Sequence, residues 1–284
     1  MTSYLLTKKN FSKEALLEAG VAVQGRNGLF DFFRGRVMFP LIDHRENIVG
    51  FSGRILEQND AVGKYVNTRE TLAYHKGEHF YGFNVTKDAI RKANQAIIVE
   101  GEFDVISCFS HGVSNVVGVK GTALTEQHVN LLARYAQKIT FCFDGDHAGQ
   151  EAIKRSMPVV EKKGLTATVI VIPHGKDPDE ALRTEAGLFK KAVHEDQGIY
   201  DYLLAHLAKT YDVHSADGKR QIVAEFLSHI IAIQNEIVKE HFLRQVSSLV
   251  SISYESIVKE MQRTRMKQHS SSLPKAPLKA KRSK

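Results

Sequence analysis

Short apolar runs rich in β-branched residues alternate with helical patterns through the middle of this 284-residue chain. Repeated strand–helix units predict a parallel sheet with helices on its faces, and the strands of such a sheet are buried on both sides. The expected strands are residues 96–99, 115–119, 138–143 and 167–172, and the expected helices are 102–110, 125–136 and 147–163. The sequence therefore predicts an α/β domain in the centre of the chain.

Acidic residues follow three of the four expected strands. They are Glu100 and Asp104, Asp144 and Asp146, and Asp177 and Asp179. Ligands bind beyond the carboxyl ends of the strands in such sheets, so these carboxylates are expected to converge there. Because converging carboxylates repel one another unless they share a cation, the pattern predicts a divalent-metal site that handles phosphates, with Mg²⁺ as the expected ion.

Each acidic cluster also has a simpler interpretation. Glu102 and Asp104 would complement the dipole of a helix that begins there, which is favoured for Glu102 and left open for Asp104. The sequence Asp144-Gly-Asp also occurs in plain hairpin turns. Asp177 precedes a proline and could cap a helix. Asp177 and Asp179 are therefore expected to be secondary metal ligands.

Basic and aromatic residues are interleaved before residue 83. Residues 36–42 and 48–55 are expected to form a hairpin. Basic grooves with aromatic platforms suit single-stranded nucleic acid. The basic residues of this segment are Arg34, Arg36, Arg54, Lys64, Arg69 and Lys76. For most of the aromatic residues a small core is favoured, because Phe39 and Phe51 fall on buried strand faces.

Apolar residues recur at helical spacing after about residue 178, with no convincing strand, which predicts three or more packed helices. Beyond about Arg265 the chain is polar and then rich in proline and lysine, and disorder is expected. A net charge of +7 and a pI of about 9.2 favour attraction of a polyanion such as nucleic acid, although part of the excess charge lies in this tail.

Cysteine usage and hydropathy exclude several classes of protein. Cys108 and Cys142 form no C-x-x-C pair, so a cysteine-based zinc site is not expected, and both are predicted to be reduced core residues. No apolar run has the length of a membrane span, and no signal peptide is visible. A cytoplasmic protein without membrane contact is expected.

Several motifs in order resemble the RNA-polymerase core of bacterial DnaG-type primases. The TOPRIM part of the resemblance is carried by Val99-Glu-Gly-Glu-Phe-Asp104, Gly121-Thr-Ala-Leu-Thr125, Cys142-Phe-Asp-Gly-Asp-His-Ala-Gly149 and Gly175-Lys-Asp-Pro-Asp-Glu180. The N-terminal part is carried by Arg36-Val-Met-Phe-Pro-Leu-Ile-Asp43, Gly50-Phe-Ser-Gly-Arg54, Lys64-Tyr-Val-Asn-Thr68, His75-Lys-Gly77 and Tyr81-Gly-Phe83. The resemblance spans residues 5 to 200 and, more weakly, the helical remainder.

The resemblance implies a DNA-templated RNA polymerase that makes short primers on single-stranded DNA from nucleoside triphosphates by two-metal transfer, with Mg²⁺ or Mn²⁺. It implies a TOPRIM domain (95–177) between a mixed α/β N-terminal subdomain (1–94) and a helical bundle (178–265), followed by a disordered basic tail (266–284). Glu100, Asp144 and Asp146 would be the main ligands. Asp104, Asp177 and Asp179 would complete the acidic site. The implied nucleotide or template contacts are Arg36, Arg54, Lys64 and Lys76, of which Lys64 and Lys76 are also placed in the catalytic set.

The chain departs from the family in three ways. The usual Tyr after Val-Glu-Gly is Glu102. Cysteines for the family's zinc domain are missing, and no room is expected for a helicase-binding domain after the lysine-rich tail. A replicative helicase or a zinc domain in trans would then be partners of a monomer in the nucleoid or replisome. The alternatives left open are a TOPRIM nuclease, a topoisomerase as the less favoured enzyme, or a single-strand-binding component that is inactive without partner domains.

Overall fold

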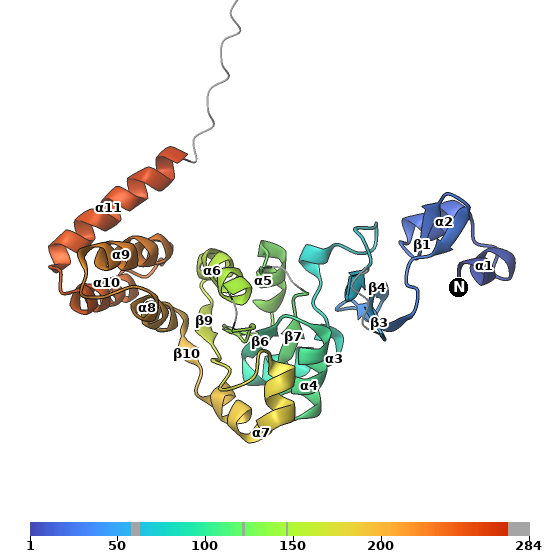
Figure 1. Ribbon diagram of the computed structural model, residues 1–284, viewed down its shortest axis with the longest axis horizontal. Helices are drawn as coiled ribbons and strands as arrows, with labels where there is room; N and C mark the ends of the chain where they lie inside the picture. Colours follow the sequence, from blue (N-terminus) through green and yellow to red (C-terminus); the bar gives the residue numbers. More distant parts are fainter. Residues whose placement is uncertain (58–62, 121–122, 146, 272–284) are drawn as a thin grey trace, which may run out of the picture. The chain divides into compact units, whose positions relative to one another are not determined.

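The computed structural model describes residues 1–57, 63–120, 123–145 and 147–271, with side chains up to residue 266 (Figure 1). The chain divides into two compact units, Met1–Gln197 and Gly198–Lys284. The first unit holds two small antiparallel sheets and a larger, mostly parallel sheet. No helix in the described ranges is both long and apolar enough to cross a lipid bilayer.

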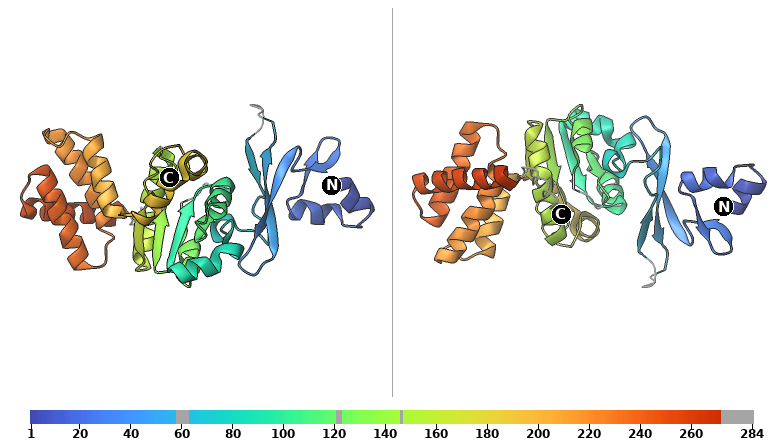
Figure 2. Two further views of the ribbon diagram at one scale, coloured as in Figure 1. Left: turned by 90° about the horizontal axis from the view of Figure 1, so that it is seen from below. Right: turned by 90° about the horizontal axis from the view of Figure 1, so that it is seen from above.

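The two small sheets come first in the chain. Helices α1 (Thr2–Thr7) and α2 (Lys13–Glu18) precede the pair β1 (Ala22–Gly25) and β2 (Gly28–Asp31). The second sheet has the order β3-β4-β5, with β3 (Arg36–Ile42), β4 (Ile48–Ile55) and β5 (Tyr65–Asn67), and its hairpin is drawn in blue in Figure 2. The hairpin has the expected bounds. Its turn is stabilised by Asp43, which accepts backbone hydrogen bonds from Arg45 (2.8 Å) and Asn47 (2.9 Å).

The larger sheet has five strands in the order β10-β9-β8-β6-β7. They are β6 (Gln95–Val99), β7 (Val116–Gly118), β8 (Lys138–Phe141), β9 (Thr166–Val169) and the two-residue β10 (Gln197–Gly198). Strand β6 pairs in parallel with β7 and β8, and β8 with β9, so the carboxyl ends of these four strands lie at one edge. The expected parallel sheet is confirmed. The expectation of no strand after residue 178 is wrong, because β10 adds a short edge strand that no apolar run marks.

Helices cover both faces of this sheet. In Figure 1, α5 (Glu126–Leu132) and α6 (His147–Lys162) lie on one side and α4 (Glu102–Ser110) and α7 (Pro178–His194) on the other. The short η1 (Lys76–Glu78) and α3 (Phe83–Ala93) connect the second small sheet to β6. Ile97, Val99, Cys108, Cys142 and Phe189 belong to one buried cluster. Both cysteines are free and buried, as expected.

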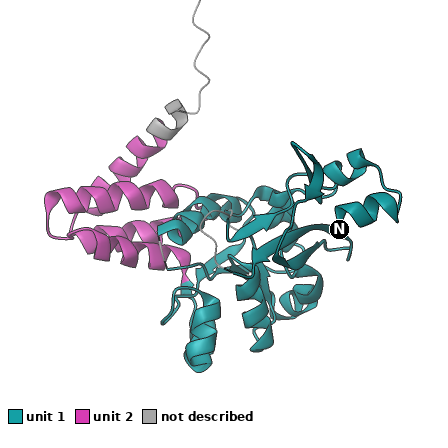
Figure 3. Cartoon of the chain, turned by 45° about the vertical axis from the view of Figure 1, so that its right-hand side comes forward, with its two compact units in different colours: residues 1–197 teal, residues 198–284 magenta. Residues whose placement is uncertain are grey.

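The second unit, magenta in Figure 3, is helical. It contains α8 (Ile199–Thr210), α9 (Ala216–Ile230), α10 (Glu236–Val250) and α11 (Tyr254–Ser271). Buried Ile222, Phe226, Phe242 and Val246 come from the helical repeats that predict these elements. Helix α11 continues to Ser271, past the point where disorder is expected, because Met, Gln, Arg and Lys favour a helix even without an apolar face. Residues 272–284 of the expected tail lie outside the described residues.

Candidate active site

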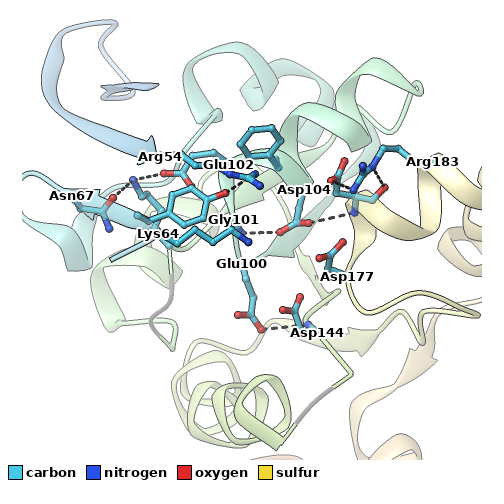
Figure 4. Close-up of a pocket in the computed structure, with 14 residues that line it drawn as sticks. Arg54, Lys64, Asn67, Glu100, Gly101, Glu102, Asp104, Asp144, Asp177 and Arg183 are labelled. Atoms are coloured by element: carbon cyan, nitrogen blue, oxygen red, sulfur yellow. Dashed lines mark hydrogen bonds and ion pairs between the residues drawn. The ribbon is translucent and has the colours of Figure 1, made fainter. Parts of the chain in front are cut away.

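A cavity of about 460 Å³ opens at the carboxyl ends of the parallel strands (Figure 4). One side of it, here called the acidic wall, is formed by Glu100, Asp104, Asp144, Asp177 and Asp179. The facing side, here called the basic wall, is formed by Arg54 of β4, by Lys64 just before β5, and by Tyr65 and Asn67 of β5. The remaining lining residues are Gly101, Glu102, Phe103, Lys120 and Arg183. The structure thus brings together five of the six acids that the sequence singles out.

Glu100 and Asp144 follow neighbouring strands. Because β6 and β8 pair in parallel, their ends bring the two residues together, and the backbone N–H of Asp144 donates a hydrogen bond of 3.3 Å to Glu100 Oε1. Gly149, in the first turn of α6, packs against this corner. A Cβ there would lie 2.3 Å from the carbonyl oxygen of Asp144 and 3.1 Å from Glu100 Oε1. The helix therefore reaches the acidic wall only because residue 149 has no side chain.

Asp104 is the most buried carboxylate of the acidic wall, with 7% of its surface exposed. It accepts hydrogen bonds from the backbone N–H groups of Gly101 (2.9 Å) and Asp179 (3.3 Å). Burial raises the pKa of Asp104 to about 7, and the negative charges of Asp177 and Asp179 add to the increase. Asp104 therefore caps α4, and it also lies in an environment where a neighbouring cation would be strongly favoured.

Asp177 and Asp179 lie at the start of α7. Asp177 is the N-cap of this helix, with Oδ1 accepting a hydrogen bond of 2.7 Å from the Glu180 N–H, and Pro178 follows at the first helical position. The capping interpretation of Asp177 is therefore confirmed, although Asp177 also lines the cavity. Asp179 accepts hydrogen bonds from the Ser107 hydroxyl and from Arg183 Nη2 (2.7 Å).

The basic wall combines charge with aromatic surface. The guanidinium carbon of Arg54 lies 4.3 Å from the centre of the Phe103 ring and 5.5 Å from that of Tyr65. Arg54 Nη1 also donates a hydrogen bond of 3.1 Å to the Tyr65 hydroxyl. These contacts fix the guanidinium between two aromatic rings at the mouth of the acidic wall. Lys64, just before β5, is exposed and adds a second positive charge to this side.

Glu102 and Lys120 form a buried ion pair, with 2.6 Å between Glu102 Oε1 and Lys120 Nζ and 5% of each side chain exposed. Lys120 Nζ also donates a hydrogen bond of 2.9 Å to Asn67 Oδ1. The expectation that Glu102 only complements the helix dipole is therefore wrong, because its carboxylate has a specific cationic partner. Neither Lys120 nor Asn67 is predicted from the sequence as a functional residue. The available signal was the position of Lys120, which follows a strand as the acids do.

Two other candidates, Arg36 and Lys76, lie outside the cavity. Arg36 donates hydrogen bonds to the carbonyl oxygens of Gly53 (3.0 Å), Gly63 (2.9 Å) and Lys64 (3.1 Å), so its guanidinium holds the β3-β4-β5 sheet together and does not line the cavity. Lys76 is in η1 and does not line the cavity either, although its charge contributes to the lowered pKa of Lys120. Asp146 lies outside the described residues.

The acidic wall has the donor chemistry of a hard divalent cation, because all its side chains offer carboxylate oxygens. Within the described part of the chain, no three His, Cys, Asp or Glu side chains are close enough together to hold a metal ion. Burial is the main cause of the raised pKa of Asp104, and the charges of Asp177 and Asp179 raise it further. The donor set therefore fits such an ion in its chemistry, because hard divalent cations prefer carboxylate oxygens.

Comparison with known families divides the chain in three. Residues 1–87 match the N-terminal domain of the DNA primase catalytic core, residues 97–182 match the Toprim-like family, and residues 200–255 match the DnaB-helicase binding domain of primase. A crystal structure of a DNA primase domain from Pseudomonas aeruginosa is 30% identical and superimposes with a TM-score of 0.77, covering 90% of this chain and 83% of that one. The chain belongs to the DnaG-type primase family. The Toprim-like match implies, in general terms, that primases of this kind bind a divalent metal ion.

Two further primases agree with this assignment. The DNA primase of Clostridium acetobutylicum is 34% identical over 254 residues, which is 89% of this chain but 42% of the relative. The structure of a DnaG primase catalytic domain bound to single-stranded DNA is 27% identical, with a TM-score of 0.75 over 89% of this chain and 81% of that one. The chain thus spans less than half the length of the curated relatives it matches and corresponds to the primase catalytic core.

The match at residues 200–255 corrects one expectation. From the sequence no helicase-binding domain is expected, because such a domain would have to follow the lysine-rich tail. The family of DnaB-helicase binding domains of primase nevertheless matches the helical unit that precedes this tail. Helical periodicity in α8, α9 and α10 indicates packed helices but carries no information about a partner. The helical unit has only a weak resemblance to the family in its sequence motifs. Its relationship to the family is therefore given by this match.

Proposed function

We propose that this chain is an RNA polymerase that synthesises short primers on a single-stranded DNA template. The observation that carries the proposal is the cavity in which carboxylates from three strand ends face Arg54 and Lys64. To react, a triphosphate needs basic side chains that bind its phosphates and carboxylates that bind a metal ion. This cavity offers both kinds of group within one unit, and the chain belongs to the primase family. In the relative's structure it is single-stranded DNA that is bound.

The residues of the two walls take different parts in this proposal. Glu100, Asp144 and Asp146 are the main metal ligands, and Asp104, Asp177 and Asp179 complete the acidic site. Mg²⁺ or Mn²⁺ bound there would activate the primer 3′-hydroxyl and stabilise the charge of the triphosphate and the departing pyrophosphate. Arg54 and Lys64 hold the triphosphate by charge-assisted hydrogen bonds. Arg36 and Lys76, outside the cavity, contact the template backbone.

The helical unit suggests the setting in which the enzyme works. Because residues 200–255 match the DnaB-helicase binding domain of primase, we propose a replicative helicase as the partner of this unit. A zinc domain acting in trans would supply template recognition. The proposed enzyme is a monomer that acts in the bacterial replisome, and its substrates are nucleoside triphosphates and the growing RNA primer.

The deciding experiment is templated incorporation of labelled nucleoside triphosphates on single-stranded DNA, with Mg²⁺ or Mn²⁺. Asp144→Ala and Asp146→Ala should each lower synthesis about a hundredfold or more, because each removes negative charge that the metal requires. Asp88→Ala, on the exposed face of α3 and outside the cavity, is the matched control and should behave as wild type. Full synthesis by either aspartate variant, with native circular dichroism, would sink the site assignment.

A nicking assay run beside the synthesis assay separates the proposed polymerase from a Toprim nuclease. Cleavage of DNA without nucleotide incorporation, lost in Asp144→Ala, would assign the same acids to a nuclease. Binding of single-stranded DNA without nucleotide incorporation or cleavage would show that the chain is a DNA-binding component that lacks both activities.

A further inference from the structure

Lys120 is held from three directions at the junction of the acidic and basic walls. Its ammonium lies 2.6 Å from Glu102 Oε1 in α4 and donates a hydrogen bond of 2.9 Å to Asn67 Oδ1 in β5. Its backbone N–H donates a hydrogen bond of 2.8 Å to the carbonyl oxygen of Glu100. Asn67 and Glu102, the two partners of this ammonium, are both labelled in Figure 4. One residue thus connects β5, the end of β6 and the start of α4.

Both the backbone conformation and the burial of Lys120 are energetically unfavourable for a lysine. Its φ is 60°, in the left-handed region that a side chain such as lysine rarely adopts. The side chain keeps only 5% of its surface exposed, and burial lowers the pKa of its ammonium. Strained backbone persists where the surrounding contacts enforce it, and such positions cluster at functional sites. A buried ion pair gives little stability compared with apolar side chains of similar size, so stability alone does not account for the pair.

The charge of the pair argues against a direct electrostatic role. Glu102 neutralises Lys120 at 2.6 Å, so together they add almost no net field to the cavity. Positive charge for a phosphate comes instead from Arg54 and Lys64. Both are tied to β5, since Arg54 pairs with Tyr65 in the β4–β5 register and Lys64 directly precedes the strand. Asn67 is the residue of β5 through which Lys120 can control where this strand lies.

We propose that Lys120, with Glu102 as its counter-ion, is a positioning residue that fixes the basic wall relative to the acidic wall through Asn67. The pair would thereby set the spacing between the walls, so that a triphosphate bound by Arg54 and Lys64 lies opposite the carboxylates. This inference rests on the proposed function. It adds that the affinity for nucleoside triphosphates depends on a buried pair that touches no phosphate.

The test is a double-mutant cycle on nucleotide binding by the full chain. Asn67→Ala cuts the link to β5 and leaves the ion pair, whereas the paired change Glu102→Leu with Lys120→Met replaces both charges by apolar groups. A fluorescent, non-hydrolysable nucleoside triphosphate with Mg²⁺ is the probe. Each change should weaken binding about fivefold to tenfold, and all three substitutions together should weaken it no further, because both changes break one link. If the factors by which the two changes weaken binding multiply in the triple variant, Asn67 acts independently of Lys120 and the inference is overturned.

A matched control breaks a second ion pair of the same length. Lys138 Nζ lies 2.6 Å from Asp196 Oδ2, and Lys138 is the first residue of β8, at the other end of the strand from Asp144. Lys138→Met should lower the melting temperature without changing nucleotide affinity. If the apolar pair variant does not fold, Asn67→Ala alone decides, and unchanged affinity in that variant overturns the inference. A wild-type chain that binds no nucleotide overturns the proposed function as well, whereas tight wild-type binding with equally tight variants overturns only the role of Lys120.

Discussion

At the scale of single residues, Gly149 has the tightest steric constraint at the acidic wall. We predict that Gly149→Ala lowers metal-dependent synthesis at least about tenfold, because the new Cβ would lie 2.3 Å from the Asp144 carbonyl and push the start of α6 away. Its stability should fall by roughly 1–3 kcal/mol, as for other overpacked sites. Primer synthesis and urea unfolding of the same preparation measure the two effects.

The control for this variant is Gly187→Ala in α7. Nothing lies within 4 Å of a Cβ at residue 187, so alanine should leave synthesis unchanged and raise the free energy of unfolding by up to about 1 kcal/mol through its better helix propensity. Equal behaviour of the two alanine variants would show that space at residue 149 is not limiting.

His128 gives the fold a predictable dependence on pH. It is fully buried, its Nδ1 accepts a hydrogen bond from the Thr125 N–H, and its Nε2 lies 3.1 Å from the His79 carbonyl. Burial lowers the pKa of His128 from 6.5 to about 4. A histidine with a lowered pKa is neutral in both states above pH 6.5, so the stability is fully present there. Below that pH the unfolded chain binds a proton that the folded chain does not. The free energy of unfolding should therefore fall by about 3 kcal/mol between pH 6.5 and 4.

Urea unfolding between pH 7.5 and 4.5 measures this loss, and comparison with His128→Gln isolates it from other groups. The variant should be less stable at neutral pH but show a flatter pH dependence. His214→Gln, at an exposed position, should keep the wild-type slope. The assignment to His128 is wrong if all three proteins lose stability in parallel.

At the scale of elements, the first turn of α7 serves both folding and the proposed chemistry. Asp177→Ala removes the side-chain cap at the Glu180 N–H and should lower the free energy of unfolding by about 1 kcal/mol. Asp177→Ser keeps a capping oxygen but no charge, so we predict wild-type stability with weaker metal dependence of synthesis. Chemical unfolding and a Mn²⁺ titration of primer synthesis separate the two roles. If the Asp177→Ser variant has both wild-type stability and wild-type metal dependence of synthesis, Asp177 only caps the helix.

How well each element could be predicted depends on how local its determinants are. The β3–β4 hairpin has its expected bounds because alternation along the strands and the Asp43 turn lie within one short segment. The parallel strands are also recognisable from their apolar runs, and their carboxyl ends place Glu100 beside Asp144. Lys120 and Asn67 are 53 residues apart, and their contact depends on how β5 meets the larger sheet. Sequence patterns of one segment contain no information about such a contact, so the buried pair could not be predicted.

At the scale of the whole molecule, the chain separates the proposed chemistry from the proposed partner. Every residue that lines the cavity lies within Met1–Gln197, whereas the helicase-binding match lies within the second unit. The motifs before residue 180 identify the primase family from its polar and glycine residues, which the chemistry requires. The helical unit shows only apolar periodicity, which many helical proteins share, so its relationship to helicase binding could not be predicted from the residues.

This separation predicts that the two units can be studied apart. Residues 1–197 should keep nucleotide affinity within about twofold of the full chain, because the cavity and the Lys120 contacts are retained. Residues 198–271 should fold as a helical protein around Ile222, Phe226 and Val246 and bind a DnaB-type helicase, whereas residues 1–197 should not. Calorimetric titration of each fragment with the nucleotide analogue and with the helicase checks both statements. Helicase binding by residues 1–197 alone would contradict this assignment of the two functions to separate units. Nucleotide binding that requires the second unit would contradict it as well.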